Sequence, residues 1–305
     1  RMDYVIGIDI GGTNFRIGTV SEDGQLMNFE KKSSRSLVSD DAVERIGKEI
    51  KQYISRYELE GKIKAVAIGV PSIVSKDKSF VYSTPNLKGI DNIDLGNLLS
   101  RHLSLPVYID RDVNYLLLND IQVNNLDIEG EKTILGFYVG TGFGNAIYIN
   151  GNIYSGKNGV AGELGHIPMY GVAKQCSCGN KGCAETICSG LYLEKITKEF
   201  FPNTLIDDVF IKHSKEPIIE QFVKSIGIIA ATEINILDPD YVIFAGGVIS
   251  MKGFPKDFLI TEMKKSIRKP YPEKNIEFIF TEHTQQSGVL GSAAYVFGKN
   301  KLLMK

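Results

Sequence analysis

Two stretches of the chain repeat one local pattern, and this repeat limits the fold more than any other feature. Residues 4–20 read YVIGIDIGGTNFRIGTV, and residues 133–151 read TILGFYVGTGFGNAIYING. Each is an apolar run, a glycine-rich turn and a second apolar run, which is typical of two strands joined by a tight turn. Strand-like and helix-like segments alternate after both stretches. We therefore expect duplicated α/β domains with a ligand-binding cleft between them.

Apolar periodicity predicts the main helices. In residues 41–59, apolar side chains recur on one stripe, as expected of an amphipathic helix. Residues 217–239 predict a long apolar helix, and residues 287–299 predict a closing helix that packs on the N-terminal half. We expect a smaller N-terminal domain of residues 1–111 plus 288–305 and a larger C-terminal domain of residues 112–287.

Composition excludes several classes of protein. The 305 residues carry a formal net charge of −1, so nothing indicates general attraction to nucleic acid or to an anionic membrane. No apolar run reaches the roughly 20 residues of a membrane span. No secretory signal precedes the first strand. We expect a cytoplasmic protein whose partners include neither nucleic acid nor membrane.

Three glycine turns favour nucleotide binding. Without a Cβ, the backbone N–H groups of such turns can approach a phosphate closely. One such turn is weak evidence, because glycine turns are common in hairpins, but three together favour ATP over structural turns. Asp9, at the end of the first strand, could orient water on Mg²⁺, although it could equally cap the turn. The candidate ATP-binding residues are Asp9, Gly11, Gly12, Thr13, Gly140, Thr141, Gly142, Gly246 and Gly247.

All four cysteines lie within Cys176–Cys188, shortly after His166. Zn²⁺ prefers four nitrogen or sulfur ligands in a tetrahedron, and Cys-x-Cys-x4-Cys has the spacing of such a site. We predict structural zinc held by a loop over residues 166–183, with His166, Cys176, Cys178 and Cys183 as ligands. The alternative is three unligated thiols in a glycine-rich loop. Cys188 is spaced too loosely and is expected to stay free.

Five motifs together carry a family resemblance. They are DIGGTN, GTGFG, GELGH, CSCGNKGCAE and LDPDYVIFAGG, and they occur in this order over essentially the whole chain. They resemble the ROK sugar kinases, which have the duplicated ribonuclease H-like (hexokinase–actin-like) fold. The resemblance implies ATP-dependent phosphorylation of a hexose 6-hydroxyl, a structural zinc and a homodimer. Repressors of the family carry a helix-turn-helix domain before the DIGGTN strand, where this sequence begins, so we expect a kinase.

The resemblance also implies roles for single residues. Asp112, in IDRDVN, matches the general base of the family, although an aspartate before an apolar helix is commonly an N-cap. Glu163 and Glu185 match glutamates that bind sugar hydroxyls near C1 and C2, and His166 is implied to lie close to the sugar. Asn86 is implied to contact the sugar from the other side, unless it is only a turn residue after a proline.

Two departures from the family pattern bear on the choice of sugar. Arg111 stands where the family usually has Asn, and Ser72 stands where it usually has Gly. Arginine offers only donors, whereas asparagine offers a donor and an acceptor, so the hydroxyl recognised there is expected to differ. VPSIVSKDK, STPNL, RDVN and GVAGELGHIP resemble the D-allose kinase branch. Allose is the C3 epimer of glucose, so D-allose is the favoured substrate and D-allose 6-phosphate the product.

Three alternatives stay open. The same family includes kinases for N-acetylmannosamine, glucose or a β-glucoside. A protein of a different class would be a regulator that senses sugar without turnover, but the retained Asp112 argues against it because a sensor needs no base. A zinc-binding interaction module is the third, and the three nucleotide-type turns argue against that.

Overall fold

The computed structural model describes residues 3–37, 39–84, 87 and 89–303. The chain divides into two compact units. Unit 1 comprises the chain up to Leu126, the segment Ser155–Ala161 and the chain from Thr284 onward. Unit 2 comprises Asp127–Tyr154 and Gly162–His283. The boundary expected between residues 111 and 112 falls at the first residue of helix α3, which packs in unit 1.

Unit 1 contains a five-stranded mixed sheet in the order β3-β2-β1-β4-β7. The first three strands are antiparallel because tight turns join them, and β4 and β7 are parallel to β1 because helical connections precede each of them. A short hairpin of β5 and β6 follows β4. The strands are β1 (Tyr4–Ile10), β2 (Asn14–Ser21), β3 (Leu26–Ser33), β4 (Ile63–Val70), β5 (Ile73–Val74), β6 (Val81–Ser83) and β7 (Val107–Arg111).

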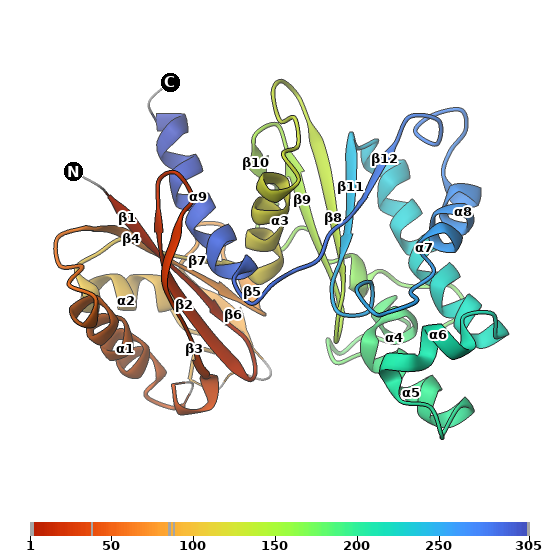
Figure 1. Ribbon diagram of the computed structural model, residues 1–305, viewed down its shortest axis with the longest axis horizontal. Helices are drawn as coiled ribbons and strands as arrows, with labels where there is room; N and C mark the ends of the chain where they lie inside the picture. The colour runs from red at the N-terminus through yellow and green to blue at the C-terminus, as the bar shows by residue number, and fades with distance from the viewer. Residues whose placement is uncertain (1–2, 38, 85–86, 88, 304–305) are drawn as a thin grey trace. The chain divides into compact units, whose positions relative to one another are not determined.

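The helices of unit 1 bury the stripes that the sequence predicts. In α1, Ile46, Ile50 and Tyr53 are fully buried in the core against the sheet. Helix α9 packs against β1, β4 and α3, and Figure 1 shows it in blue beside the red strands from the other end of the chain. The helices are η1 (Ser34–Ser36), α1 (Ala42–Arg56), α2 (Leu95–Leu103), α3 (Asp112–Val123) and α9 (Ser287–Leu303).

Unit 2 contains a second five-stranded mixed sheet, in the order β10-β9-β8-β11-β12. Strands β8, β9 and β10 are antiparallel, and β11 and β12 are parallel to β8. The long apolar helix α7 lies in the core of this unit. The strands are β8 (Thr133–Val139), β9 (Phe143–Ile149), β10 (Asn152–Ile153), β11 (Tyr241–Ala245) and β12 (Glu277–Phe280).

The helices of unit 2 are shorter than α7 in every other case. They are η2 (Leu164–His166), α4 (Glu185–Cys188), α5 (Gly190–Phe200), η3 (Ile206–Asp208), α6 (Val209–His213), α7 (Pro217–Leu237) and α8 (Lys256–Ser266). Each sheet has three antiparallel strands extended by two parallel ones, in the same chain order. The predicted duplication of an α/β unit is therefore confirmed. No helix of the described residues is long and apolar enough to cross a membrane.

Candidate active site and metal cluster

The glycine turn of unit 1 joins β1 to β2. The Gly11 N–H donates to Asn14 O at 2.8 Å, which closes the turn. Gly12 and Thr13 are exposed, and a Cβ on Gly12 would meet no atom within 4 Å. This side of the turn therefore leaves space in which an anion can approach the backbone.

Asp9 lies next to this turn, opposite Arg16 in the β1–β2 register. The Arg16 Nη1 atom is 3.1 Å from Asp9 Oδ2, and Arg16 Nε donates to Gln285 Oε1 at 2.8 Å. The arginine thus connects the carboxylate to the segment before α9. Arg16 is not among the predicted site residues, although its place across the predicted hairpin from Asp9 was a usable signal.

Asp112 is the first residue of α3, directly after β7, as the sequence predicts. Its side chain is half-buried, and its Oδ1 accepts a hydrogen bond from Val113 N at 2.7 Å. Burial, followed by the nearby negative charge of Asp9, raises the pKa of Asp112 to about 7. A carboxyl with a pKa near neutrality is suited to accept a proton at physiological pH.

Two of the three other sugar-site candidates on this unit lie within the described residues. Arg111 is 6% exposed, and its Nη1 donates to Ala161 O at 2.7 Å. Ser72 follows β4, and its Oγ is buried without a hydrogen-bond partner among the described residues. A buried hydroxyl without a partner is costly, and a ligand hydroxyl could satisfy it. Asn86 lies outside the described residues.

The glycine turns of unit 2 follow β8 and β11. Residues 140–142 join β8 to β9, and Gly246-Gly247 directly follow β11, which is parallel to β8. A Cβ on Gly140 or Gly247 would meet nothing within 4 Å, so both turns offer accessible backbone. The structure thus brings two of the three predicted nucleotide turns to the same end of one sheet.

Glu185 reaches back to the turn between β8 and β9. Its Oε2 accepts a hydrogen bond from Phe143 N at 2.8 Å. A Cβ on Gly142 would lie 2.4 Å from the same oxygen, so only glycine leaves room for this carboxylate. The contact connects the start of α4, just after the cysteine cluster, to the glycine turn.

The predicted metal ligands lie together in unit 2. One ligand atom from each of His166, Cys176, Cys178 and Cys183 lies within 4.8 Å of the other three. Hydrogen bonds from Cys176 N to Asn180 O and from Gly179 N to Cys176 O fold the loop between the cysteines. Four such donors at these separations fit a tetrahedral zinc site. Burial raises the pKa of the Cys183 thiol to about 12, so a thiolate there needs a cation beside it.

His166 is oriented by two neighbours. Its Nδ1 is 3.6 Å from Cys176 Sγ, and its Nε2 is 3.6 Å from Glu163 Oε2. One ring nitrogen thus faces the sulfur cluster and the other faces a candidate sugar ligand. A metal on Nδ1 would leave the proton on Nε2, the ring nitrogen that faces Glu163. Cys188 lies apart from the cluster, fully buried, with its Sγ donating to Ala184 O at 3.0 Å.

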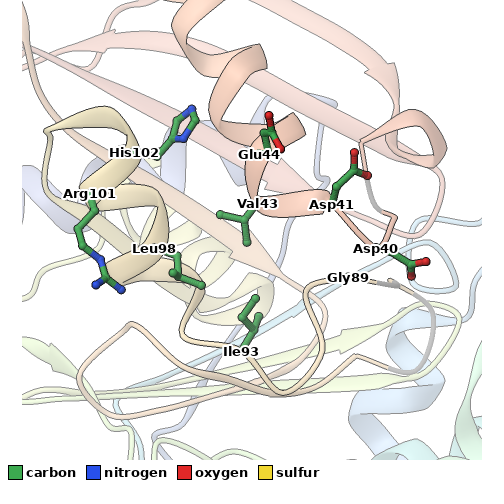
Figure 2. Close-up of a pocket in the computed structure, with 9 residues that line it drawn as sticks. All are labelled: Asp40, Asp41, Val43, Glu44, Gly89, Ile93, Leu98, Arg101 and His102. Carbon is green, nitrogen blue, oxygen red and sulfur yellow. The ribbon is translucent and has the colours of Figure 1, made fainter.

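Unit 1 also has a pocket of about 640 Å³ at α1 and α2, away from these residues. Figure 2 shows acidic side chains on one side, Arg101 and His102 on the other, and apolar side chains between them. None of the candidate residues named above lines this pocket. It is lined by Asp40, Asp41, Val43, Glu44, Gly89, Ile93, Leu98, Arg101 and His102.

Known proteins resemble the chain along most of its length. The ROK family model matches residues 5–299. The chain belongs to the ROK family. It is similar to the "Glucokinase" of Thermotoga maritima, with 24% identity covering 96% of each chain. It is also similar to the "N-acetyl-D-glucosamine kinase" of Photobacterium profundum, with 28% identity covering 94% of this chain and 97% of the relative.

Solved structures of the family share the fold. A ROK family glucokinase from Streptomyces griseus, in complex with glucose and AMPPNP, gives a TM-score of 0.75 at 22% identity, covering 96% of this chain and 98% of the other. The ROK hexokinase from Thermus thermophilus gives 0.79 at 22% identity, covering 97% and 99%. The predicted hexokinase-like α/β fold with mixed sheets is therefore confirmed for this ROK protein.

Proposed function

We propose that this ROK protein is an ATP-dependent kinase that phosphorylates the 6-hydroxyl of a hexose, with D-allose as the favoured substrate. The enzyme class, a phosphotransferase with an alcohol acceptor, is confirmed by relatives named as glucokinase and N-acetylglucosamine kinase. The observation that carries the proposal is the Asp112 carboxyl. It lies at a strand–helix junction near Asp9, with its pKa raised to about 7.

In the proposed reaction, Asp112 is the general base. Its carboxylate takes the proton of the sugar 6-hydroxyl while that oxygen attacks the γ-phosphorus of ATP in line. The bond from the γ-phosphorus to the bridging oxygen breaks, and ADP leaves with both electrons of that bond. Phosphoryl transfer needs mainly positioning of the reactants and neutralisation of charge. A single general base is therefore enough to accept the proton of the attacking hydroxyl.

The backbone turns are proposed to bind ATP. Gly11, Gly12 and Thr13 of unit 1 would contact its phosphates, as would Gly140, Thr141 and Gly142 of unit 2. The accessible glycine backbone in both turns supports this assignment. Gly246 and Gly247 would contribute a third turn. The carboxylate of Asp9 has the oxygen atoms that Mg²⁺ prefers, and it would hold the ion through water.

Unit 2 is proposed to orient the sugar. Glu163 and Glu185 would accept hydrogen bonds from hydroxyls near C1 and C2, and His166 would lie beside them. A structural zinc on His166, Cys176, Cys178 and Cys183 would fix the loop that carries these groups. The 3.6 Å approach of His166 Nε2 to Glu163 supports a direct link from the metal ligand to the sugar ligand.

The preference for D-allose is proposed from Arg111 and Ser72, with Asn86 as a further sugar contact. Arg111 is buried and hydrogen-bonded to Ala161 O, so its position is fixed by the protein before a ligand arrives. Ser72 Oγ is buried without a partner among the described residues and could bind a sugar hydroxyl. A polar pocket rejects a misplaced hydroxyl strongly, because its own groups are then left unpaired.

The test is an ADP-release assay with a panel of sugars and ATP·Mg²⁺. The panel holds D-allose, D-glucose, D-mannose, N-acetylmannosamine, N-acetylglucosamine and cellobiose. We expect D-allose to give the highest kcat/KM, and Asp112→Asn to reduce kcat by about 10²–10⁴-fold. Asp127→Asn, which removes an exposed carboxylate that pairs with Lys132, is the matched control and should retain full turnover.

The alternatives predict other results. A kinase for N-acetylmannosamine, glucose or a β-glucoside would turn over another sugar fastest and still lose activity with Asp112→Asn. A sugar-sensing regulator would bind a hexose tightly and release no ADP. The homodimer and the cytoplasmic location stay predictions. Sedimentation equilibrium tests the first, and fractionation of cells that express the protein tests the second.

A further inference from the structure

Lys78 combines two features that are costly for a lysine. It lies in the turn between β5 and β6 with φ of +65°, a conformation that normally favours glycine. The turn is held by hydrogen bonds from Lys78 N to Ser75 O and from Phe80 N to Ser75 Oγ, both at 2.9 Å or less. The lysine is also only 8% exposed. Neither its backbone nor its burial is favourable, so a compensating interaction is expected.

The side chain of Lys78 ends on Asp110 in β7. Its Nζ is 2.6 Å from Asp110 Oδ2, and the two side chains are 10% and 4% exposed. The same ammonium lies 5.4 Å from the ring centroid of Tyr295 in α9. In addition, Ile109 N donates to Lys78 O at 2.7 Å. The turn is thus attached to β7 through both backbone and side chain.

Asp110 carries this attachment into α3. While Oδ2 contacts Lys78, Oδ1 accepts from Arg111 N at 2.8 Å and from Asn114 Nδ2 at 2.9 Å. These bonds join the end of β7 to the first turn of α3. Asp112 lies between the two donors in the chain, so the network brackets the proposed base.

We propose that Lys78 is a positioning residue for phosphoryl transfer, whose ion pair with Asp110 fixes the β7–α3 junction that carries Arg111 and Asp112. The inference rests on the proposed role of Asp112 as base. A role in stability alone explains the arrangement poorly. Buried ion pairs often contribute little net stability over apolar replacements, and the left-handed backbone adds a further cost.

The charges around Asp112 predict how the pH profile responds. Asp9 of β1 faces it and is paired with Arg16 of β2, and Asp110 and Arg111 of β7 are adjacent to it. With Lys78 present, an ammonium offsets the charge of Asp110. Removing only that ammonium leaves the negative charge of Asp110 without its ion-pair partner near the base. The pKa of Asp112 should then rise. The acid limb, which is the fall of kcat/KM as pH decreases, should therefore move to higher pH.

The test compares Lys78→Met and Lys78→Gly with the wild type in the ADP-release assay. We expect both to lower kcat about 10–100-fold, because small displacements of a reacting group have effects of that size. KM for ATP should stay within about twofold, and the acid limb should shift upward. Lys78→Gly keeps the test valid if the methionine variant folds poorly, because glycine adopts the φ of this turn without strain. Lys78→Met combined with Asp110→Asn should return the limb toward its original pH and recover part of kcat.

Lys64→Met is the matched control. Lys64 Nζ lies 2.7 Å from Asp3 Oδ2 in the same unit, but its side chain is 43% exposed. Losing this exposed ion pair should change neither kcat nor the acid limb of the pH profile. The inference would be overturned if both Lys78 variants had the kcat and the acid limb of the wild type while Asp112→Asn was inactive. A loss of kcat with an unmoved limb and no recovery in the double variant would also overturn it. Full activity of Asp112→Asn would instead refute the proposed base and leave the proposed function, not Lys78, as the failure.

Discussion

The two units share one strand order but treat their buried carboxyl groups differently. In unit 1, Asp110 is 3% exposed and pairs with the ammonium of Lys78. In unit 2, Glu233 of α7 is 7% exposed and accepts a hydrogen bond from the neutral amide of Asn145 at 2.7 Å. Burial raises the pKa of Glu233 to about 7. Unit 1 therefore keeps a buried charge by compensating it, whereas unit 2 favours a buried carboxyl that is protonated.

The same contrast applies at the turns between the first two strands of each sheet. In unit 1, Asp9 and Arg16 form an ion pair beside the turn. In unit 2, the corresponding pair of positions is Tyr138 opposite Gly144, which carries no charge. The unit 2 turn instead receives a carboxylate from Glu185, next to the cysteine cluster. In the proposed function, unit 1 would perform the proton chemistry, and unit 2 would orient the substrate through a metal-supported loop.

The largest expected effect comes from removing a proposed metal ligand of unit 2. Cys183→Ser should abolish bound zinc, measured by elemental analysis, and lower kcat/KM for the sugar by about 100-fold or more. KM for ATP should change little, because the loss is in orientation of the sugar. Cys188→Ser is the control, since Cys188 lies outside the cluster, and it should retain both zinc and turnover. Normal turnover by metal-free protein would contradict the assigned role of the loop.

The next effect tests the proton chemistry of unit 1 through pH. Asp112 can act as base only when deprotonated, and its pKa is raised to about 7. Activity should therefore fall as pH decreases through 7, by about tenfold at pH 6, and level off above 8. The measurement is kcat/KM for the sugar at saturating ATP·Mg²⁺ between pH 5.5 and 9.

Asp9→Asn provides the comparison for this profile. Removing the negative charge of Asp9 should lower the pKa of Asp112 and move the limb to lower pH, because that charge is the second cause of the raised value. The variant is expected to be slow, but the position of the limb can be read from the activity that it retains. An identical limb in both proteins would show that another group controls the profile.

A smaller effect tests how unit 2 holds Glu185. In Gly142→Ala the new Cβ would lie 2.4 Å from Glu185 Oε2, so the carboxylate must leave Phe143 N. Loss of one hydrogen bond to a charged group predicts an increase of about tenfold in KM for the sugar. Gly140→Ala, in the same turn, meets nothing within 4 Å and should change this KM less than twofold. Equal effects of the two substitutions would exclude Glu185 as the cause.

Local patterns in the sequence predicted the features that depend on neighbouring residues. Apolar periodicity located α1, α7 and α9, and the repeated strand–turn–strand pattern predicted the duplication. Spacing identified the three clustered cysteines, because a short loop holds them together, and the preference of zinc for four ligands added His166. The apolar helix that begins at Asp112 was also expected.

The features that the sequence analysis missed depend on distant partners. Lys78 lies 32 positions from Asp110, and Asn145 lies 88 positions from Glu233. Neither pairing leaves a local signal, because it arises only when a turn or helix packs on a strand. A lysine with a left-handed backbone cannot be recognised either, since glycine and asparagine are the residues that mark such turns. The tertiary fold, not the local pattern, determines these contacts.

The smallest effect on activity is expected from Glu233→Gln, which directly tests the difference between the buried carboxyl groups of the two units. A carboxyl whose pKa rises from 4.5 unfolded to about 7 folded destabilises the fold increasingly between these values, and constantly above 7. The neutral glutamine should therefore raise the free energy of unfolding at pH 8 by up to about 3 kcal/mol. Its amide could also donate to Asn145 Oδ1, which is buried without a partner among the described residues. At pH 4 the two proteins should be equally stable, and kcat should not change.

Urea unfolding at pH 4, 6 and 8 measures this difference, with Glu220→Gln as the control. Glu220 is on the same helix but partly exposed, 3.9 Å from Lys224, so its substitution should change stability by less than about 0.5 kcal/mol at each pH. A Glu233→Gln variant that is less stable than the wild type at pH 8 would mean that the fold stabilises the charged carboxylate of Glu233 and does not raise its pKa. Unit 2 would then compensate a buried charge just as unit 1 does, and the contrast between the units would fail.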